Sequence, residues 1–247
     1  MSIDSPQDLA GLTRAGRAVA QTLQETRRQV RPGITTAQLD RIAAAVFRRW
    51  GARSAPALAY GFPGTILISV NDEVVHGIPS DRMVQPGDLV KVDVTAEVDG
   101  YIADAASTVA VPPVTRRHRR LCQCARSAFN RALDAARAGR PLNHIGRAVE
   151  REVDRRGFTV LPELHGHGIG RQIHEEPTVP NYYDRRDNQP LTEGLVITIE
   201  PLISTGSNST FEDTDGWTVR TADGSFAAHH EHTLVITGGR PLILTAA

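Results

Sequence analysis

GDLVKVD, residues 87–93, decides the fold expected of this 247-residue chain, because a related segment, GLVITIE, follows at residues 194–200. The second segment contains an apolar run of the kind found in buried strands, Leu195–Ile199, and the first begins a stretch that alternates like a strand. Each segment ends on an acid, Asp93 or Glu200. Two-fold packing of such related segments would place the two acids on opposite sides of one central site.

The repeat extends upstream of these strands. Gly33–Gly51 matches Gly139–Gly157 without a gap, and both segments have the apolar spacing of a helix. The sequence therefore predicts one domain made of two related halves, about residues 1–112 and 113–247, that pack about a pseudo-two-fold axis.

Local signals predict two helices and several strands in each half. The helices are expected from Ser5 to Val30, from Thr35 to Trp50, from about Thr115 to Ala138 and from about Asn143 to Arg156. Other strands are expected at Thr65–Val70, Trp217–Arg220 and Ala227–Thr237, and a turn-rich loop at Ala57–Gly64. The fold class is α+β, with a central antiparallel sheet shared by the halves and the helices on its outer face.

Asp99-Gly100 is the expected turn of a hairpin with strands Leu89–Glu97 and Tyr101–Val111. This two-residue turn makes Asp93 and Asp104 diagonal neighbours on one face, with Cβ atoms roughly 7 Å apart. Most surface aspartates are simply solvated, but the apolar residues around Asp93 leave little of this strand exposed. Because two carboxylates buried on one face are costly unless a cation lies between them, the hairpin predicts a metal site.

Further acids and histidines extend this candidate site. Glu200 ends the second apolar run and Glu231 interrupts another strand-like segment, where a charge is rarely buried without a partner. The glycine-rich stretch Gly166–Pro177 contains His167 and, seven residues later, His174. An oxygen-rich ligand set with one histidine suits two hard or borderline divalent ions, and a water shared by two such ions indicates hydrolysis. No serine-nucleophile elbow, phosphate-binding loop or H-E-x-x-H motif competes with this interpretation.

Composition and charge exclude several other classes of protein. Apolar residues make up 40% and charged residues 23% of the chain, which is ordinary for a soluble globular protein. The formal net charge is zero, so nucleic acid is not expected as the main partner. Cys122 and Cys124 are too close for a disulfide framework, and neither a signal peptide nor a membrane span is expected. We expect a cytoplasmic monomer.

The motifs that contain the candidate residues are Asn71–Pro79, Lys91–Thr95, Gly166–Pro177, Thr198–Pro201 and Glu231–Thr233, with Asp104 eleven residues after Asp93. With these motifs the chain resembles the type I methionine aminopeptidases, dinuclear metallopeptidases with the pita-bread (creatinase/aminopeptidase) fold. The resemblance extends from the first helix to Ile236. The pseudosymmetry of that family agrees with the internal repeat.

The resemblance implies a cofactor of two divalent metal ions held by five residues. Asp104 and Glu231 would bridge the ions. His167 and Glu200 would complete the ligand shell of one ion, and Asp93 that of the other. Glu200 would also handle the proton of the nucleophilic water. Co, Mn, Fe and Zn all suit this ligand set, so the identity of the metal stays open.

The activity implied is that of a methionyl aminopeptidase, which hydrolytically removes the initiator methionine from nascent proteins with a small second residue. His76 and His174 match family histidines that contact the substrate and take part in catalysis. Four apolar residues would line the methionine pocket: Phe62, Leu67, Ile173 and Trp217. Thr95 would support the metal ligands from behind.

The chain departs from the family pattern near the expected pocket. Val75 stands where a cysteine usually precedes the first histidine, Gly64 lies in Pro-Gly-Thr instead of Pro-Lys-Ser, and Ala59 replaces a tyrosine. These changes leave the selectivity for methionine open. His229 replaces an amide side chain and shares a strand face with Glu231, so we expect it to add a titratable group behind the ligands.

Three alternatives remain to be weighed. A prolidase or aminopeptidase P usually has an extra N-terminal domain, whereas the expected metal hairpin here begins already at Leu89. A type II methionine aminopeptidase has a helical insert, whereas only residues 175–199 separate His174 from Glu200. A pita-bread binding protein without activity typically loses ligands, and none of the five is lost here.

The expected partners are the N-termini of nascent polypeptides, with no membrane and no specific nucleic acid. A basic cluster, Arg116–Arg120, would allow transient contact with ribosomal RNA, although a solvated helix start is the favoured interpretation.

Overall fold

The computed structural model describes residues 1–246. Its first elements are α1 (Pro6–Gln29), α2 (Thr36–Trp50), β1 (Arg53–Ser54), α3 (Ala55–Tyr60), β2 (Leu67–Val70), β3 (Glu73–Val75), β4 (Leu89–Val98) and β5 (Tyr101–Ala110). They are followed by α4 (Arg116–Ala135), α5 (Asn143–Arg155), β6 (Thr159–Val160), β7 (Gly166–Gly168), β8 (Glu175–Val179), β9 (Val196–Ile199) and β10 (Leu202–Ser204). The last are β11 (Thr210–Glu212), β12 (Val219–Thr221), β13 (Ala227–His229), β14 (His232–Val235) and β15 (Leu242–Ile243).

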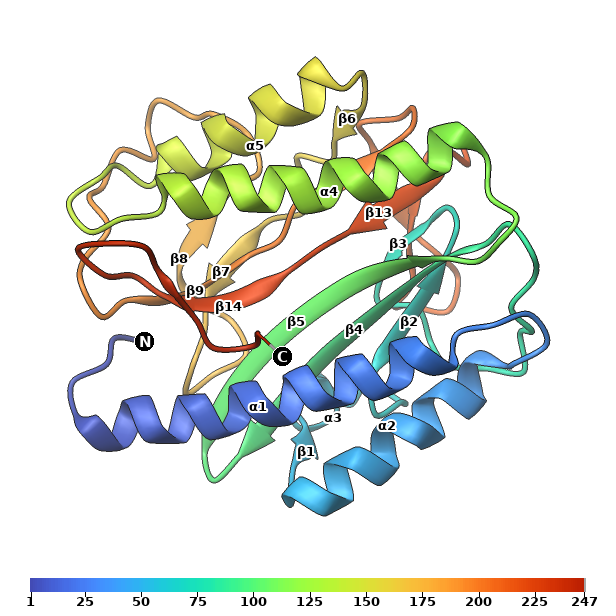
Figure 1. Cartoon of the computed structure of the whole chain (residues 1–247), viewed down its shortest axis with the longest axis horizontal. Helices are drawn as coiled ribbons and strands as arrows, with labels where there is room; N and C mark the ends of the chain where they lie inside the picture. Colours follow the sequence, from blue (N-terminus) through green and yellow to red (C-terminus); the bar gives the residue numbers. More distant parts are fainter. Residues whose placement is uncertain (247) are drawn as a thin grey trace.

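The strands lie in the middle of the molecule, between two pairs of helices. Figure 1 shows α4 and α5 above, and α1 and α2 below, the long ribbons of β4, β5, β14 and β13. One sheet pairs β4 with β1, β2 and β5, and another has the order β15-β14-β9-β7-β8. They adjoin where Ala106 and Glu231 exchange backbone hydrogen bonds of 3.3 and 2.9 Å. This antiparallel arrangement confirms the predicted α+β class.

Each pair of helices covers its own sheet through an apolar core. Leu39 and Phe47 of α2 belong to one core with the valines of β4. Leu121 and Phe129 of α4 belong to a second core with Ile197 and Ile199 of β9. Burying one such side chain contributes about 1.5–3 kcal/mol, so these cores fix the sheets rigidly beneath the helices. None of the helices within residues 1–246 has the length and apolar character needed to span a membrane.

The predicted helix starts and the hairpin are confirmed. Ser5 caps α1, and Thr35 forms the expected capping box with Gln38 at the start of α2. The hairpin turn has positive φ angles of 52° at Asp99 and 80° at Gly100, which a type I′ turn requires. Thr95 faces Asp104 across the strands, so the predicted register is correct.

The loop predicted at Ala57–Gly64 is wrong in its first half, because α3 extends to Tyr60. The Ser54 hydroxyl accepts a hydrogen bond from the backbone N–H of Ala57, and Pro56 lies in the first turn. Gly61 ends the helix in the left-handed region with φ 76°. These are ordinary start and stop signals, but they enclose a helix of only six residues without an apolar repeat.

Several strand boundaries also differ from the prediction. The strand expected at Trp217–Arg220 begins instead at Val219, because the Asp215 carboxylate accepts hydrogen bonds from the N–H groups of Trp217 and Thr218 and holds them in a turn. The strand expected at Ala227–Thr237 is broken into β13 and β14 between His229 and His232. The break lets the chain pass from one sheet to another and places Glu231 at the crossing.

Candidate active site

A cavity of about 250 Å³ collects the predicted ligands from separate elements. Asp93 comes from β4, Asp104 from β5 and His167 from β7, while Glu200 directly follows β9 and Glu231 directly precedes β14. Glu200 follows the short strand β9, whereas Asp93 lies within the ten-residue strand β4, which forms the hairpin with β5. All five side chains nevertheless line one cavity.

The ligand atoms form two overlapping groups. Asp104, His167 and Glu231 each offer an atom within 4.8 Å of the others, and so do Asp93, His229 and Glu231. Glu231 belongs to both groups. Glu200 joins them through an oxygen that lies 3.5 Å from Nε2 of His167. This spacing allows a divalent ion in each group, with a shared carboxylate between them.

Burial makes this cluster of acids unfavourable without a cation. Burial raises the pKa of Asp104 to about 6. Burial and, next, the charge of Asp104 raise the pKa of Asp93, Glu200 and Glu231 well above their ordinary values. The imidazole of His167 has its pKa lowered by burial to about 3, so it is a neutral ligand near pH 7.

Unpartnered atoms show that the residues fit a metal. One buried oxygen on each of Asp93, Asp104 and Glu231 has no hydrogen-bond partner among the described residues. A buried carboxylate oxygen left unpaired is costly, and a divalent ion is the partner that several converging oxygens and an imidazole suit. The site therefore has the donor chemistry of a metal centre.

Hydroxyl groups hold the ligands from behind. Thr95 donates to Asp104 Oδ2 at 2.8 Å, in the place expected for it. Thr198 donates to Glu200 Oε1 at 2.9 Å and accepts from the backbone N–H of His167 at 3.0 Å. This bracing by Thr198 was not predicted, although alternation along β9 places its side chain on the same face as Glu200.

His76 and His174 line the cavity with their side chains exposed to it, so a substrate can reach both rings. His174 Nδ1 lies 2.7 Å from the hydroxyl of Tyr60, and its ring centroid is 4.3 Å from that of His167. The role of Tyr60 was missed because it lies in the segment predicted as a loop. A tyrosine thus stands at the cavity edge one residue after Ala59, where the family pattern had suggested that it was lost.

The family model of metallopeptidase family M24 matches residues 10–238. The chain belongs to metallopeptidase family M24. Methionine aminopeptidase 2 of Bacillus subtilis is 47% identical over 247 residues, and the match covers 99% of each chain. A methionine aminopeptidase of Helicobacter pylori is 35% identical, with 99% of this chain and 98% of that one covered. The resemblance to methionine aminopeptidases is confirmed, and membership of M24 implies a divalent metal.

Solved structures confirm the pita-bread fold. The crystal structure of a methionine aminopeptidase from Thermotoga maritima has a TM-score of 0.97 and 34% identity, with 100% of both chains covered. The prolidase from Pyrococcus furiosus shares the fold with a TM-score of 0.78 at 21% identity, but this chain covers only 65% of its length. The M24 chain described here therefore matches the methionine aminopeptidases along their whole length.

The apolar wall of this M24 site includes three of the four predicted pocket residues. Leu67, Ile173 and Trp217 line the cavity. Phe62 lies one layer back, with its ring edge-on to Trp217 at a centroid distance of 5.2 Å. The departure at Gly64 has a steric reason, because a Cβ there would lie 2.9 Å from the Phe62 ring and 3.0 Å from Pro79.

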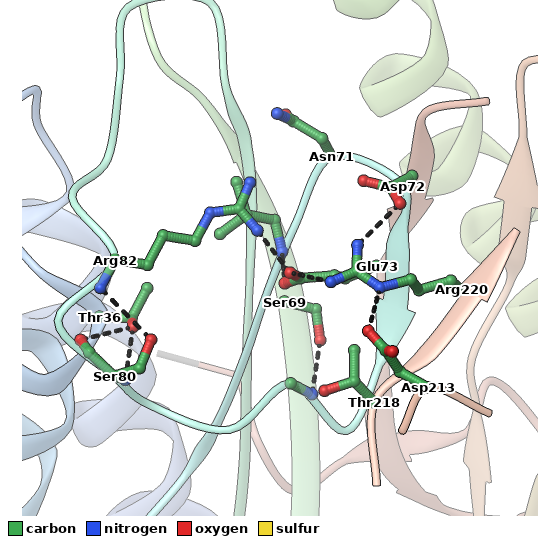
Figure 2. Close-up of polar contacts among 12 residues, drawn as sticks. Thr36, Ser69, Asn71, Asp72, Glu73, Ser80, Arg82, Asp213, Thr218 and Arg220 are labelled. Carbon is green, nitrogen blue, oxygen red and sulfur yellow. Dashed lines mark hydrogen bonds and ion pairs between the residues drawn. The ribbon is translucent and has the colours of Figure 1, made fainter. Parts of the chain in front are cut away.

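A network of side-chain ion pairs fixes the position of the segment that carries His76. Figure 2 shows the Glu73 carboxylate between two arginines, Arg82 and Arg220. Arg220 also donates to Asp72 at 2.8 Å and to Asp213 at 2.6 Å, so its guanidinium joins three acids. Arg220 pairs with Glu73 across β12 and β3, and His76 directly follows β3.

The other side of His76 is held as well. The Ser69 hydroxyl accepts from the backbone N–H of Gly77 at 2.9 Å, and Ser80 exchanges hydrogen bonds with Thr36 of α2. A Cβ at position 77 would lie 2.3 Å from the carbonyl oxygen of Ile68, so only glycine fits there. His76 itself has a φ of 61°, an uncommon value for a residue with a side chain, which these contacts stabilise.

Proposed function

We propose that this chain is a methionine aminopeptidase, which hydrolyses the bond after an N-terminal methionine when the second residue is small. The observation that supports this most is the convergence of five ligand residues beside a cavity of about 250 Å³ with an apolar wall. Two exposed histidines border the same cavity. The full-length similarity to proteins of this name supports the same activity.

Five residues would hold two divalent ions, which we propose to be Co, Mn, Fe or Zn. Asp104 and Glu231 would bridge the ions, His167 and Glu200 would complete one ligand shell, and Asp93 would complete the other. When bound, the ions would lower the pKa of a shared water and supply positive charge for the transition state of hydrolysis.

Glu200 would move the proton. Thr198 holds one of its oxygens at 2.9 Å and so orients the carboxylate toward His167 and the cavity. We infer that Glu200 takes up the proton of the attacking water and returns it to the leaving amine. A carboxylate fixed in this way can transfer a proton without first reorienting.

The histidines would bind the peptide. Because the Tyr60 hydroxyl bonds Nδ1 of His174, Nε2 remains for a substrate carbonyl. His76 offers its ring from the opposite segment, held by the network around Glu73. Leu67, Ile173 and Trp217 would surround the thioether side chain of methionine, which needs an adaptable apolar pocket.

A pair of peptides tests the proposal. Purified protein with added Mn or Co should release methionine from Met-Ala-Ser and should not release alanine from an Ala-Pro peptide. Cleavage only before proline would make the chain a prolidase-like enzyme. No release from either peptide with any of the four metals would support a pita-bread binding protein without activity.

Arg220→Lys should reduce kcat for methionine release about tenfold, because a small displacement of His76 is costly to a positioned reaction. Lysine keeps the charge but cannot bond Asp72, Glu73 and Asp213 at once as arginine does. Steady-state kinetics should show this loss with metal binding unchanged, since Arg220 touches none of the ligands. The control is Arg186→Lys, which alters an exposed pair with Asp184. Equal kinetics for the two variants would remove the positioning role.

We propose that the chain is a single catalytic domain of two related halves, about 1–112 and 113–247. The order of two helices followed by a strand that leads to a ligand supports this, with Asp93 on β4 and Glu200 after β9. We further propose that it acts as a cytoplasmic monomer on nascent polypeptides. Transient contact with a ribosome through Arg116–Arg120 at the start of α4 is part of the same proposal.

A further inference from the structure

We propose that His229 is a further metal ligand, which adds a nitrogen donor to the ion held by Asp93 and Glu231. This inference rests on the proposed metal centre and deepens it. Asp93, His229 and Glu231 each have a ligand atom within 4.8 Å of the others. Nε2 of His229 lies 3.4 Å from Glu231 and 3.9 Å from Glu200. The ring therefore lies among the acids and not behind them.

The ring of His229 lacks any other partner. It is 1% exposed, and both ring nitrogens are buried without a hydrogen bond to any described residue. Although Nε2 is 3.4 Å from Glu231 Oε2, no hydrogen bond joins them. An imidazole buried in this way is costly unless something else binds it, and a metal ion between Asp93 and Glu231 would do so.

The backbone presents this ring to the site. Thr108 of β5 accepts a hydrogen bond from the N–H of His229 at 2.8 Å and donates one to its carbonyl at 2.9 Å. Opposite, His229 pairs with Leu202 of β10. The backbone of His229 is thus fixed along both edges of its strand, while its side chain remains available to bind a metal ion.

The surroundings of His229 suit a neutral imidazole. The ring is buried, and burial lowers its pKa. A neutral imidazole is the form that binds metal. With His229 and His167 as ligands, each of the two ions would have one nitrogen donor, and such mixed sites favour borderline ions such as Co and Zn over Mn.

X-ray absorption of the protein loaded with two equivalents of Co(II) counts the nitrogen donors directly. We expect about one imidazole per cobalt, averaged over the two ions, against about one half if His167 is the only nitrogen ligand. His229→Gln should lower the count to about one half and weaken Co(II) binding to one site about 10–100-fold. Binding of Mn(II) should change less. A matched control is His230→Gln, whose ring packs on Phe129 and His232 instead.

The outcomes separate this inference from the proposed function. A count of about one half in the unaltered protein overturns the ligand role and leaves His229 as a neighbour of the acids. Unchanged spectra and Co(II) affinity in His229→Gln do the same. If Asp104→Asn also binds Co(II) normally, the metal centre itself is refuted and the proposed function fails with it. Because the first count needs no variant, a folding defect in His229→Gln does not obscure the answer.

Discussion

Glu231→Gln is expected to reduce the rate of methionine release by the metal-loaded protein at least about 10³-fold. In the metal-free protein the same substitution should raise the free energy of unfolding by about 1–2 kcal/mol. Activity falls because Glu231 is the residue common to both groups of ligand atoms. Stability rises because the amide keeps the shape of the side chain but removes a charge from a buried cluster of acids.

The gain in stability should depend on pH in a defined direction. Burial and then the charges of Asp104, Glu200 and Asp93 raise the pKa of Glu231 well above its ordinary value. A carboxyl with a raised pKa binds more protons in the folded than in the unfolded state, so it destabilises the fold increasingly as pH rises above about 4. The difference between Glu231→Gln and the unaltered protein should therefore be small near pH 4 and larger at pH 7.

Urea unfolding of the metal-free proteins at pH 4 and pH 7 measures this difference. Glu193→Gln is the matched control, since it makes the same substitution at an exposed position and should leave both activity and stability unchanged. Lower stability of metal-free Glu231→Gln at pH 7 would show instead that the charge of Glu231 is already compensated within the protein.

Metal binding should raise the melting temperature by about 5–10 °C. A metal at a concentration 100-fold above its Kd stabilises the folded state by about 2.7 kcal/mol, and each kcal/mol shifts the melting temperature of a chain of this size by about 2–4 °C. The shift arises because the ions bind oxygens of Asp93, Asp104 and Glu231 that otherwise have no partner among the described residues. A chelator should reverse it.

Differential scanning fluorimetry with and without Mn or Co tests this shift. Asp104→Asn should lose most of the shift, whereas Asp134→Asn, an exposed position on α4, should retain it. A full shift in Asp104→Asn would place the stabilising ion elsewhere on the molecule.

The internal repeat and the Asp99-Gly100 turn were the features from which the positions of the candidate acids could be predicted. Two related segments that end in acids predicted that Asp93 and Glu200 share one site, and Asp99-Gly100 predicted the register that places Asp104 near Asp93. Such features are local, because strand alternation and a two-residue turn determine which side chains share a face. The helices were predictable for the same reason, since caps and apolar spacing lie within each segment.

The features of the site and fold that the sequence did not predict depend on contacts between segments far apart in the chain. Arg220 joins Asp72, Glu73 and Asp213, and no spacing in the sequence relates it to His76. Tyr60 bonds His174, 114 residues away. The break between β13 and β14 follows from a change of sheet, which alternation within one strand could not reveal.

The two-metal mechanism is tested most directly by following methionine release from Met-Ala-Ser while Co(II) is added to the metal-free protein. Bound cobalt is counted in the same samples. We expect no release without metal and a rate that rises until about two ions are bound per chain. Release at full rate without metal, or two bound ions with no release of methionine, would contradict the two-metal mechanism.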